Sequence, residues 1–130
     1  MKKTWIFVLS AFLSSGAWAG WENAVENSTG GLTVYVDSST IHRSGTIAKM
    51  WVLFDYKNRE KWGDQLYKST KMQEEFDCAE ERSRNIYLIV FVGNMGDGKV
   101  ITAIDKPDIW APIGPDSIGE HVWQVACGKR

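Results

Sequence analysis

Alternation of apolar and polar side chains, which is typical of half-buried β-strands, is the strongest pattern in this chain. Three apolar residues alternate within residues 32–37, and residues 21–27 alternate less regularly. A polar turn with two glycines separates the two segments at residues 28–31. We therefore expect a hairpin at the start of the fold.

The most pronounced strand is predicted at residues 46–56, after a polar and turn-like stretch at residues 37–44. Trp51 and Leu53 alternate with further apolar residues, so that both faces of this strand are apolar. Such a pattern indicates a central strand that is covered on both sides. We expect a helix near the C-terminus on one face and more protein on the other, with a partner subunit as one candidate.

The segment at residues 66–78 contains many helix formers, yet Met72, Phe76 and Cys78 share one face of a strand. We favour a strand over an amphipathic helix here, because no clear capping residues bound the segment. The other predicted elements are a charged hairpin tip at residues 57–64, a charged turn at 79–84 and an apolar strand at 85–93. A Gly-rich turn at 94–98, a last strand at 99–104 and an extended connector at 105–114 follow.

A short helix is predicted at residues 117–127. Ser117 can accept a backbone N–H at its start while Glu120 reaches back, which is the capping-box pattern, and Gly128 supplies a C-terminal stop. About three helical turns are too few for stability in water alone, so this helix needs a further attachment. Its predicted apolar face consists of Ile118, Val122, Val125 and Ala126.

Cys127 can supply that attachment, because the one other cysteine of the chain is Cys78. Two cysteines in an exported protein favour a disulfide. A metal site is the competing interpretation, but His42 and His121 lack a ligand-like spacing to the cysteines. We therefore predict one disulfide, no metal site and no cofactor.

The N-terminus has the features of a cleaved secretion signal. Two lysines precede an apolar run at residues 4–13, and residues 17–19 (Ala-Trp-Ala) have the small-x-small cleavage pattern. A membrane anchor is the alternative, but the run is shorter than the roughly 20 residues that span a bilayer, and no later segment approaches that length. We expect a signal peptide at residues 1–19, one exported domain at residues 20–130, and no transmembrane segment.

Composition narrows the classes of function. Without the two lysines of the signal, 13 of the 15 basic side chains remain against 16 acidic ones, a formal charge of −3. Nucleic acid is disfavoured as a partner, since duplex binding needs a concentrated excess of basic side chains. Catalysis is disfavoured too, because no nucleophile elbow accompanies the histidines and the adjacent Glu74 and Glu75 would point to opposite faces of a strand. We expect no catalytic residues and no enzyme.

A basic stretch around Trp62 is the candidate region for binding a protein partner. Its cations outnumber Glu60 and Asp64, and Trp and Arg are frequent anchors at protein interfaces. A solvated hairpin tip with no binding role is the alternative. The candidate binding residues are Lys57, Arg59, Lys61, Trp62, Lys68 and Lys71.

An ordered set of short motifs runs through nearly the whole predicted domain. The motifs are Trp21, Tyr35-Val36-Asp37, Trp51-Val52-Leu53-Phe54-Asp55-Tyr56, Tyr67-Lys68-Ser69, Phe76-Asp77-Cys78, Met95-Gly96-Asp97-Gly98-Lys99-Val100, Trp110-Ala111-Pro112-Ile113, Pro115-Asp116-Ser117 and Cys127. In this order, and with the paired cysteines, the chain resembles the surface-adhesin protein E-like domain family of Gram-negative bacteria. The resemblance implies an α+β fold, a bent antiparallel sheet of about six strands with a C-terminal helix tethered to it by one disulfide.

The resemblance also implies a function. It implies an adhesin that binds host extracellular-matrix and plasma proteins such as laminin, vitronectin and plasminogen, and that can form a homodimer. A lipid-anchored adhesin would need a cysteine at the start of the mature chain, where Gly20 stands. We therefore expect the protein in the periplasm or secreted, with a periplasmic structural or envelope-assembly module that has no host ligand as the alternative function.

Overall fold

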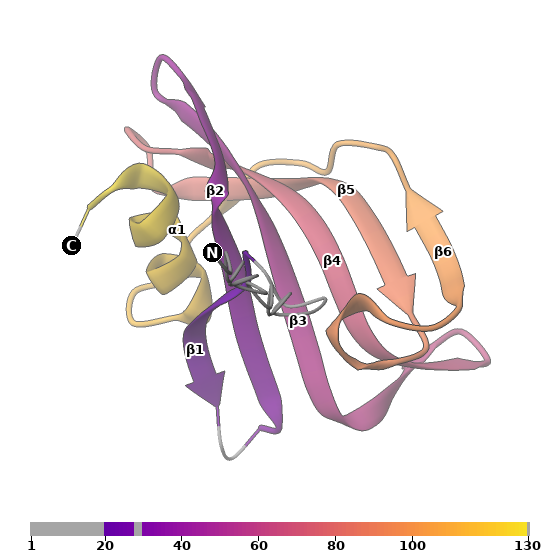
Figure 1. The fold of residues 1–130 in the computed structure, drawn as a ribbon. Coiled ribbons are helices and arrows are strands. Elements are labelled where there is room, and N and C mark those ends of the chain that lie inside the picture. The colour runs from indigo at the N-terminus through magenta and orange to yellow at the C-terminus, as the bar shows by residue number, and fades with distance from the viewer. Residues whose placement is uncertain (1–19, 28–29, 130) are drawn as a thin grey trace, which may run out of the picture.

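The computed structural model describes residues 20–27 and 30–129. The predicted signal peptide and residues 28–29 of the first predicted turn lie outside the described residues. The elements in chain order (Figure 1) are β1 (Glu22–Asn27), β2 (Leu32–Ser44), β3 (Ile47–Trp62), β4 (Gln65–Asp77), β5 (Arg82–Phe91), the 3-10 helix η1 (Asn94–Gly96), β6 (Val100–Ile104), β7 (Ala111–Pro112) and α1 (Ile118–Cys127).

The strands form one antiparallel sheet in which β1 to β6 follow one another in chain order. The two-residue β7 pairs with the start of β5, where Arg82 lies opposite Pro112 and Ser83 opposite Ala111. In Figure 1 the sheet is strongly bent, β1 and β6 form its edges, and α1 lies beside β1 and β2. This architecture confirms the predicted α+β fold, and the segment favoured as a strand over a helix is β4.

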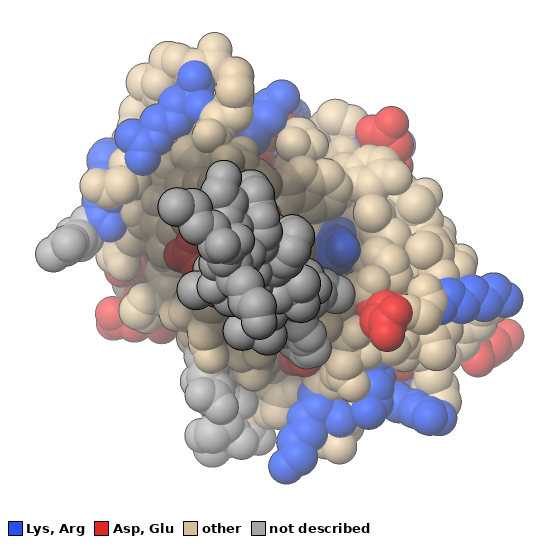
Figure 2. Space-filling model, viewed as in Figure 1, with Lys and Arg blue, Asp and Glu red and all other residues tan. Residues whose placement is uncertain are grey.

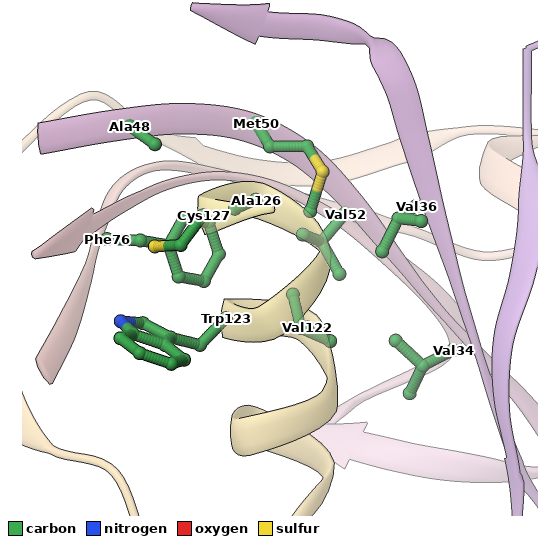
Figure 3. Packing of buried hydrophobic residues seen from close by; sticks show 10 residues of the cluster. All are labelled: Val34, Val36, Ala48, Met50, Val52, Phe76, Val122, Trp123, Ala126 and Cys127. Carbon is green, nitrogen blue, oxygen red and sulfur yellow. The ribbon is translucent and has the colours of Figure 1, made fainter. Parts of the chain in front are cut away.

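The main core lies between α1 and one face of the sheet. Cross-strand partners share a face, so the register that sets Val36 opposite Val52 aligns the apolar alternation of β2 with that of β3. Figure 3 shows these side chains directed at the helix, whose buried residues point back at them. The buried cluster consists of Val34, Val36, Ala48, Met50, Val52, Phe76, Val122, Trp123, Ala126 and Cys127.

Both ends of α1 are capped. Ser117 Oγ accepts the N–H of Glu120 at 3.1 Å, as predicted. In a capping box Glu120 would accept the N–H of Ser117. Here Glu120 Oε2 instead accepts the N–H of Asp116, one residue earlier, at 3.1 Å. Gly128 ends the helix in the left-handed conformation, with φ 64°, which glycine adopts without steric cost.

A disulfide between Cys78 and Cys127 joins the last turn of α1 to the end of β4, which confirms the predicted pairing. The indole N–H of Trp123 donates to the carbonyl of Asp77, the residue before Cys78, at 2.9 Å. The predicted apolar face of the helix was therefore wrong in part. Trp123 is buried while Val125 is 37% exposed, because the disulfide and the indole contact turn the Cys127 side of the helix toward β4.

The polar stretch at residues 37–44 belongs to β2, so its prediction as a turn was wrong. The pairing of β2 with β3 is interrupted between Asp37 and His42. There Thr40 Oγ1 accepts the N–H of Trp51 at 3.0 Å and donates to the carbonyl of Asp37 at 2.6 Å. Polar side chains thus replace ladder hydrogen bonds at a bulge, and polar composition does not mark the end of the strand.

The prediction of a charged loop at residues 57–64 was also wrong, because β3 continues through it and ends at Trp62. The turn proper is the two residues that follow. The pairing of β3 with β4 is interrupted between Asp55 and Glu60, which leaves several β3 residues opposite a single residue of β4. Beyond this irregularity the hairpin strands carry charged side chains because they extend past the core into solvent.

The charged turn predicted at residues 79–84 is shorter than expected. Arg82 and Arg84 already belong to β5, where they lie opposite Asp77 and Glu75 of β4. Both pairs are ion pairs, with N–O distances of 3.0 and 2.8 Å. Opposite charges on facing strand positions stabilise the pairing, so this charged segment is strand rather than turn.

The second face of the sheet is covered in part by the chain itself. The β5–β6 connection folds over β3 and β4, where Asp55 Oδ1 accepts the N–H of Met95 at 2.8 Å and the side-chain amide of Asn94 at 3.0 Å. Ser69 and Leu53, both on this face, are fully buried. The central, two-sided position predicted for β3 fits this arrangement. A partner subunit as a further cover stays a prediction.

Glu74 is partly buried on the core-facing side of β4, opposite Met50 of β3 and Asn85 of β5. Desolvation by burial raises the pKa of its carboxyl from 4.5 to about 7, because the charged form loses its hydration. Neither of the two ion pairs among the described residues includes Glu74. The carboxyl of Glu74 is therefore protonated more readily in the folded state than in the unfolded chain.

We expect the double variant Cys78→Ser/Cys127→Ser to lose about 4 kcal/mol of unfolding free energy. The bond spans 49 residues, and its removal returns the corresponding loop entropy to the unfolded chain. Urea unfolding followed by tryptophan fluorescence measures the loss. Wild-type protein unfolded under reducing conditions is the matched control and should behave like the variant. A variant as stable as the oxidised wild type would show that the disulfide does not hold the helix in place.

We expect the wild type to lose stability as the pH rises from about 5 to 8, because the pKa of Glu74 is higher in the folded than in the unfolded state. The stabilisation that Glu74 contributes is fully present below pH 4.5, the pKa of this carboxyl in the unfolded chain, and disappears as the pH passes about 7. Glu74→Gln should remove this slope and stabilise the protein at pH 8 by about 2 kcal/mol. Urea unfolding at several pH values measures it, with the exposed Glu80→Gln as control. Equal slopes in Glu74→Gln and wild type would refute the assignment.

Candidate protein-binding surface

The outer part of the β3–β4 hairpin, residues 57–68, carries most of the basic residues singled out in the sequence. Lys57, Arg59 and Lys61 all lie on β3 and are exposed. Lys57 and Arg59 fall within the stretch of irregular pairing between Asp55 and Glu60, and Lys61 lies opposite Leu66 of β4. Figure 2 shows basic side chains gathered at the end of the sheet where β3 leads into β4. The charges that were predicted to sit on a loop are thus carried by β3, two of them in its irregular stretch and one in the paired end of the hairpin.

This hairpin carries a net positive charge. Its four basic residues face two acidic ones, Glu60 and Asp64. Across residues 20–27 and 30–129 the ion pairs are Arg82 with Asp77 and Arg84 with Glu75, and both lie away from the hairpin. A cationic surface of this kind attracts acidic surfaces of other molecules at a distance of up to about a Debye length.

Aromatic side chains line the same hairpin. Tyr67 packs edge-on against Tyr56, with ring centroids 5.7 Å apart, and edge-on against Trp62 at 6.5 Å. Burial, and next the neighbouring Tyr67, raise the pKa of Tyr56 to about 12. Trp62 is 38% exposed, which leaves part of its ring available for contacts.

The structure separates Lys71 from the other candidate residues. Lys68 is half-buried near the base of the hairpin. Lys71 lies on the second face of the sheet, with Nζ 5.4 Å from the ring centroid of Phe91 and 5.9 Å from that of Trp21. These cation–π contacts hold the Lys71 side chain against the sheet, apart from the exposed basic residues. The exposed basic surface is therefore formed by Lys57, Arg59 and Lys61.

A pocket of about 350 Å³ lies between the hairpin and the β5–β6 edge of the sheet. Its apolar lining includes Trp62, Leu88 and Ile104, and its polar lining includes Lys106 and Asp108. Trp62 was among the predicted binding residues, but the pocket was not predicted, because its lining comes from segments far apart in the chain. No spacing or motif in the sequence connects them.

The described part of the chain holds no group of three or more His, Cys, Asp or Glu side chains that could bind a metal ion. His42 is exposed on β2, and His121 is exposed on α1. Within the same residues, none of the helices has the length and apolar character needed to cross a membrane.

The fold defines a single-sheet domain with one disulfide-tethered helix and a protruding charged hairpin. The chain belongs to the surface-adhesin protein E family, whose model matches residues 21–128. The match extends over nearly all of the described residues, so the whole fold is that of the family. No curated protein matches the sequence.

Solved structures of Haemophilus influenzae protein E have the same fold. One is 16% identical with a TM-score of 0.63, and the match covers 85% of each chain. A second, from crystal form II, is 16% identical with a TM-score of 0.64 and covers 85% of this chain and 88% of the other. Protein E from non-typeable Haemophilus influenzae gives 16% identity, a TM-score of 0.62 and coverages of 85% and 76%. At this identity the likeness concerns the fold, and the residues of the hairpin must be interpreted in this chain alone.

Proposed function

We propose that this protein is an exported, non-enzymatic, adhesin-like domain that binds acidic surfaces of host proteins through its β3–β4 hairpin. Membership of the surface-adhesin protein E family supports adhesion as the general role. The observation that carries the proposal is the exposure of Lys57, Arg59 and Lys61 without an acidic partner among the described residues. Unpaired cations on a projecting hairpin are suited to recognising carboxylates on a partner.

Charge also determines the direction of approach. The predicted mature domain is negative overall, with a formal charge of −3 once the two signal lysines are removed, while its hairpin is positive. An acidic partner is therefore repelled by most of the surface and attracted by the hairpin. This asymmetry raises the association rate for one orientation and suppresses others.

Trp62 gives the same surface an apolar anchor. Its contact with Tyr67 holds the ring in place before binding, so that little conformational entropy is lost when a partner covers it. Arginine and tryptophan side chains commonly carry a large share of binding energy at protein interfaces. Arg59, Lys61 and Trp62 are the residues that we assign to the contact.

The resemblance to protein E-like adhesins points to extracellular-matrix and plasma proteins as partners, with laminin, vitronectin and plasminogen as the first candidates. In the proposal, residues 1–19 act as the signal peptide and residues 20–130 form the exported adhesin domain. Its location is the periplasm or the exterior of the cell.

A second candidate function is a structural or envelope-assembly role in the periplasm with no host ligand. The observation that favours it is the residue at the predicted start of the mature chain, Gly20, which stands where a lipid-anchored adhesin would have a cysteine. Binding to host proteins distinguishes the two functions, since the second requires none.

We expect saturable binding of the purified protein to immobilised laminin, vitronectin or plasminogen at physiological salt. The double variant Arg59→Ser/Lys61→Ser should bind roughly tenfold more weakly, because two unpaired cations of the contact are lost. Surface plasmon resonance measures both affinities, and circular dichroism checks that the fold is intact.

The matched control is Lys49→Ser/Lys99→Ser, which removes the same charge from other parts of the surface and should bind like the wild type. Equal losses in both double variants would mean that net charge, and not the hairpin, controls binding. Absence of binding to all three proteins would favour the periplasmic structural role.

A further inference from the structure

The connector between β6 and α1 runs along the edge of β5 and is fixed to it at both ends. Figure 1 shows the chain passing from β6 along the sheet toward α1. At one end Ile104 lies opposite Leu88. At the other end β7 pairs with the start of β5, and the N–H of Ile113 donates to the carbonyl of Glu81 at 3.0 Å. Residues 105–109, between these two fixed points, are called the strap below.

The strap itself has few attachments. Each of residues 105–109 is exposed, and none belongs to a helix or strand. Among the described residues, one hydrogen bond joins the strap to the rest of the fold, from the N–H of Asp108 to the carbonyl of Asn85 at 2.7 Å. Pro107 has no N–H to donate, and the N–H of Ile109 donates to the side chain of Asp108 within the strap. Exposed segments with few hydrogen bonds are those that open locally while the fold stays intact.

Trp110 stands directly after the strap and fastens it to β5. The centroid of its ring lies 4.9 Å from Cζ of Arg82 and 4.6 Å from Cζ of Arg84. Asp77 and Glu75 hold the two guanidinium groups through ion pairs of 3.0 and 2.8 Å. Because the cations are already held in position, little side-chain entropy is lost when the ring packs on them. This arrangement of one ring over two arginines is called the clasp below.

The strap is also one wall of the pocket of about 350 Å³ that Trp62 lines from the hairpin. Residues 106–108 line it from the strap, and Leu88 and Ile104 contribute apolar lining from the sheet. On this side β5 pairs with β6 from Leu88 onward and with β7 at residues 82–83. The edge of β5 behind the strap therefore has no partner strand, and movement of the strap away from β5 would widen the pocket.

We propose that the strap opens and closes over this pocket and that the clasp at Trp110 controls the opening. In the closed state, which is the one described here, the strap covers the edge of β5 and limits access to the apolar lining of the pocket. In the open state Trp110 leaves the two arginines, the hydrogen bond from Asp108 to Asn85 breaks, and the lining is exposed. This conformational device goes beyond the proposed binding function and does not depend on it, since it uses none of the cations of the hairpin.

Amide hydrogen exchange of Asp108 in the wild type, followed by NMR, measures the opening directly. The N–H of Asp108 exchanges only when its bond to the carbonyl of Asn85 is broken. Local opening exposes little surface, so low concentrations of urea should leave this exchange rate unchanged. They should accelerate exchange at Val52, which is paired on both sides in the middle of the sheet. An Asp108 rate that rises with urea in parallel with the Val52 rate would show that the strap opens only with the whole fold, and would overturn the inference.

Trp110→Leu removes the aromatic ring of the clasp. Two cation–π contacts together change the equilibrium between closed and open strap by about tenfold, so exchange at Asp108 should become about tenfold faster. Trp110→Tyr keeps a ring over the arginines and should stay within about threefold of the wild type. The matched control is Trp62→Leu, which removes the same side chain from another wall of the pocket, where its ring contacts Tyr67, and should leave the Asp108 rate unchanged. Exchange at Val52 should be the same in all of these proteins.

Arg84→Met tests the partner of the ring. It should accelerate exchange at Asp108 in the wild type but have a smaller effect in Trp110→Leu, because the contact between the two side chains is then already absent. Equal effects in both backgrounds would mean that ring and arginine act separately, and would reject the clasp. Equal acceleration by Trp110→Leu and Trp62→Leu, or a rise of the Val52 rate together with that of Asp108, would assign Trp110 a general packing role instead.

Discussion

The attachment of α1 to the end of β4 is the constraint on which the rest of the fold depends. A ten-residue helix has little stability of its own, yet it covers the apolar residues of β2, β3 and β4. The Cys78–Cys127 bond and the contact of the Trp123 indole with the carbonyl of Asp77 hold the helix over this face. In Figure 1 the helix lies at one side of the sheet and the β3–β4 hairpin extends from the other. The core is thus completed without use of the hairpin, whose side chains are free to serve binding.

Irregular pairing shapes the strands on both sides of the core. Between Asp37 and His42, and again between Asp55 and Glu60, the ladder is interrupted while the strands continue. At the first interruption Thr40 supplies the replacement hydrogen bonds, and at the second Asp55 binds the β5–β6 connection instead. Each break lets a strand bend without ending. The long, bent β3 thereby contributes to the core in its first half and to the charged surface in its second.

Much of the fold follows from local patterns, while the site does not. Apolar alternation identified the strands of the core, and the caps at Ser117 and Gly128 bounded the helix. The errors arose where polar residues were taken to end strands, since composition does not show whether a charged segment is paired. The separation of Lys71 from the exposed basic residues could not be predicted, because its contacts with the rings of Trp21 and Phe91 come from segments far from it in the sequence. The pocket was beyond reach as well, since tertiary structure alone brings Trp62 to the β5–β6 edge.

The hairpin also shows why the count of charges is a poor guide to the partners of this protein. A domain with a negative formal charge would be expected to avoid acidic surfaces, and several of its cations are committed to internal contacts. Arg82 and Arg84 pair with carboxylates and both lie over the ring of Trp110, while Lys71 is held between aromatic rings. Lys57, Arg59 and Lys61, by contrast, form no ion pair among the described residues and stand on the hairpin that carries Trp62. Position, more than net charge, therefore determines where an acidic partner can bind, and a change at the hairpin should affect binding more than an equal change of charge elsewhere.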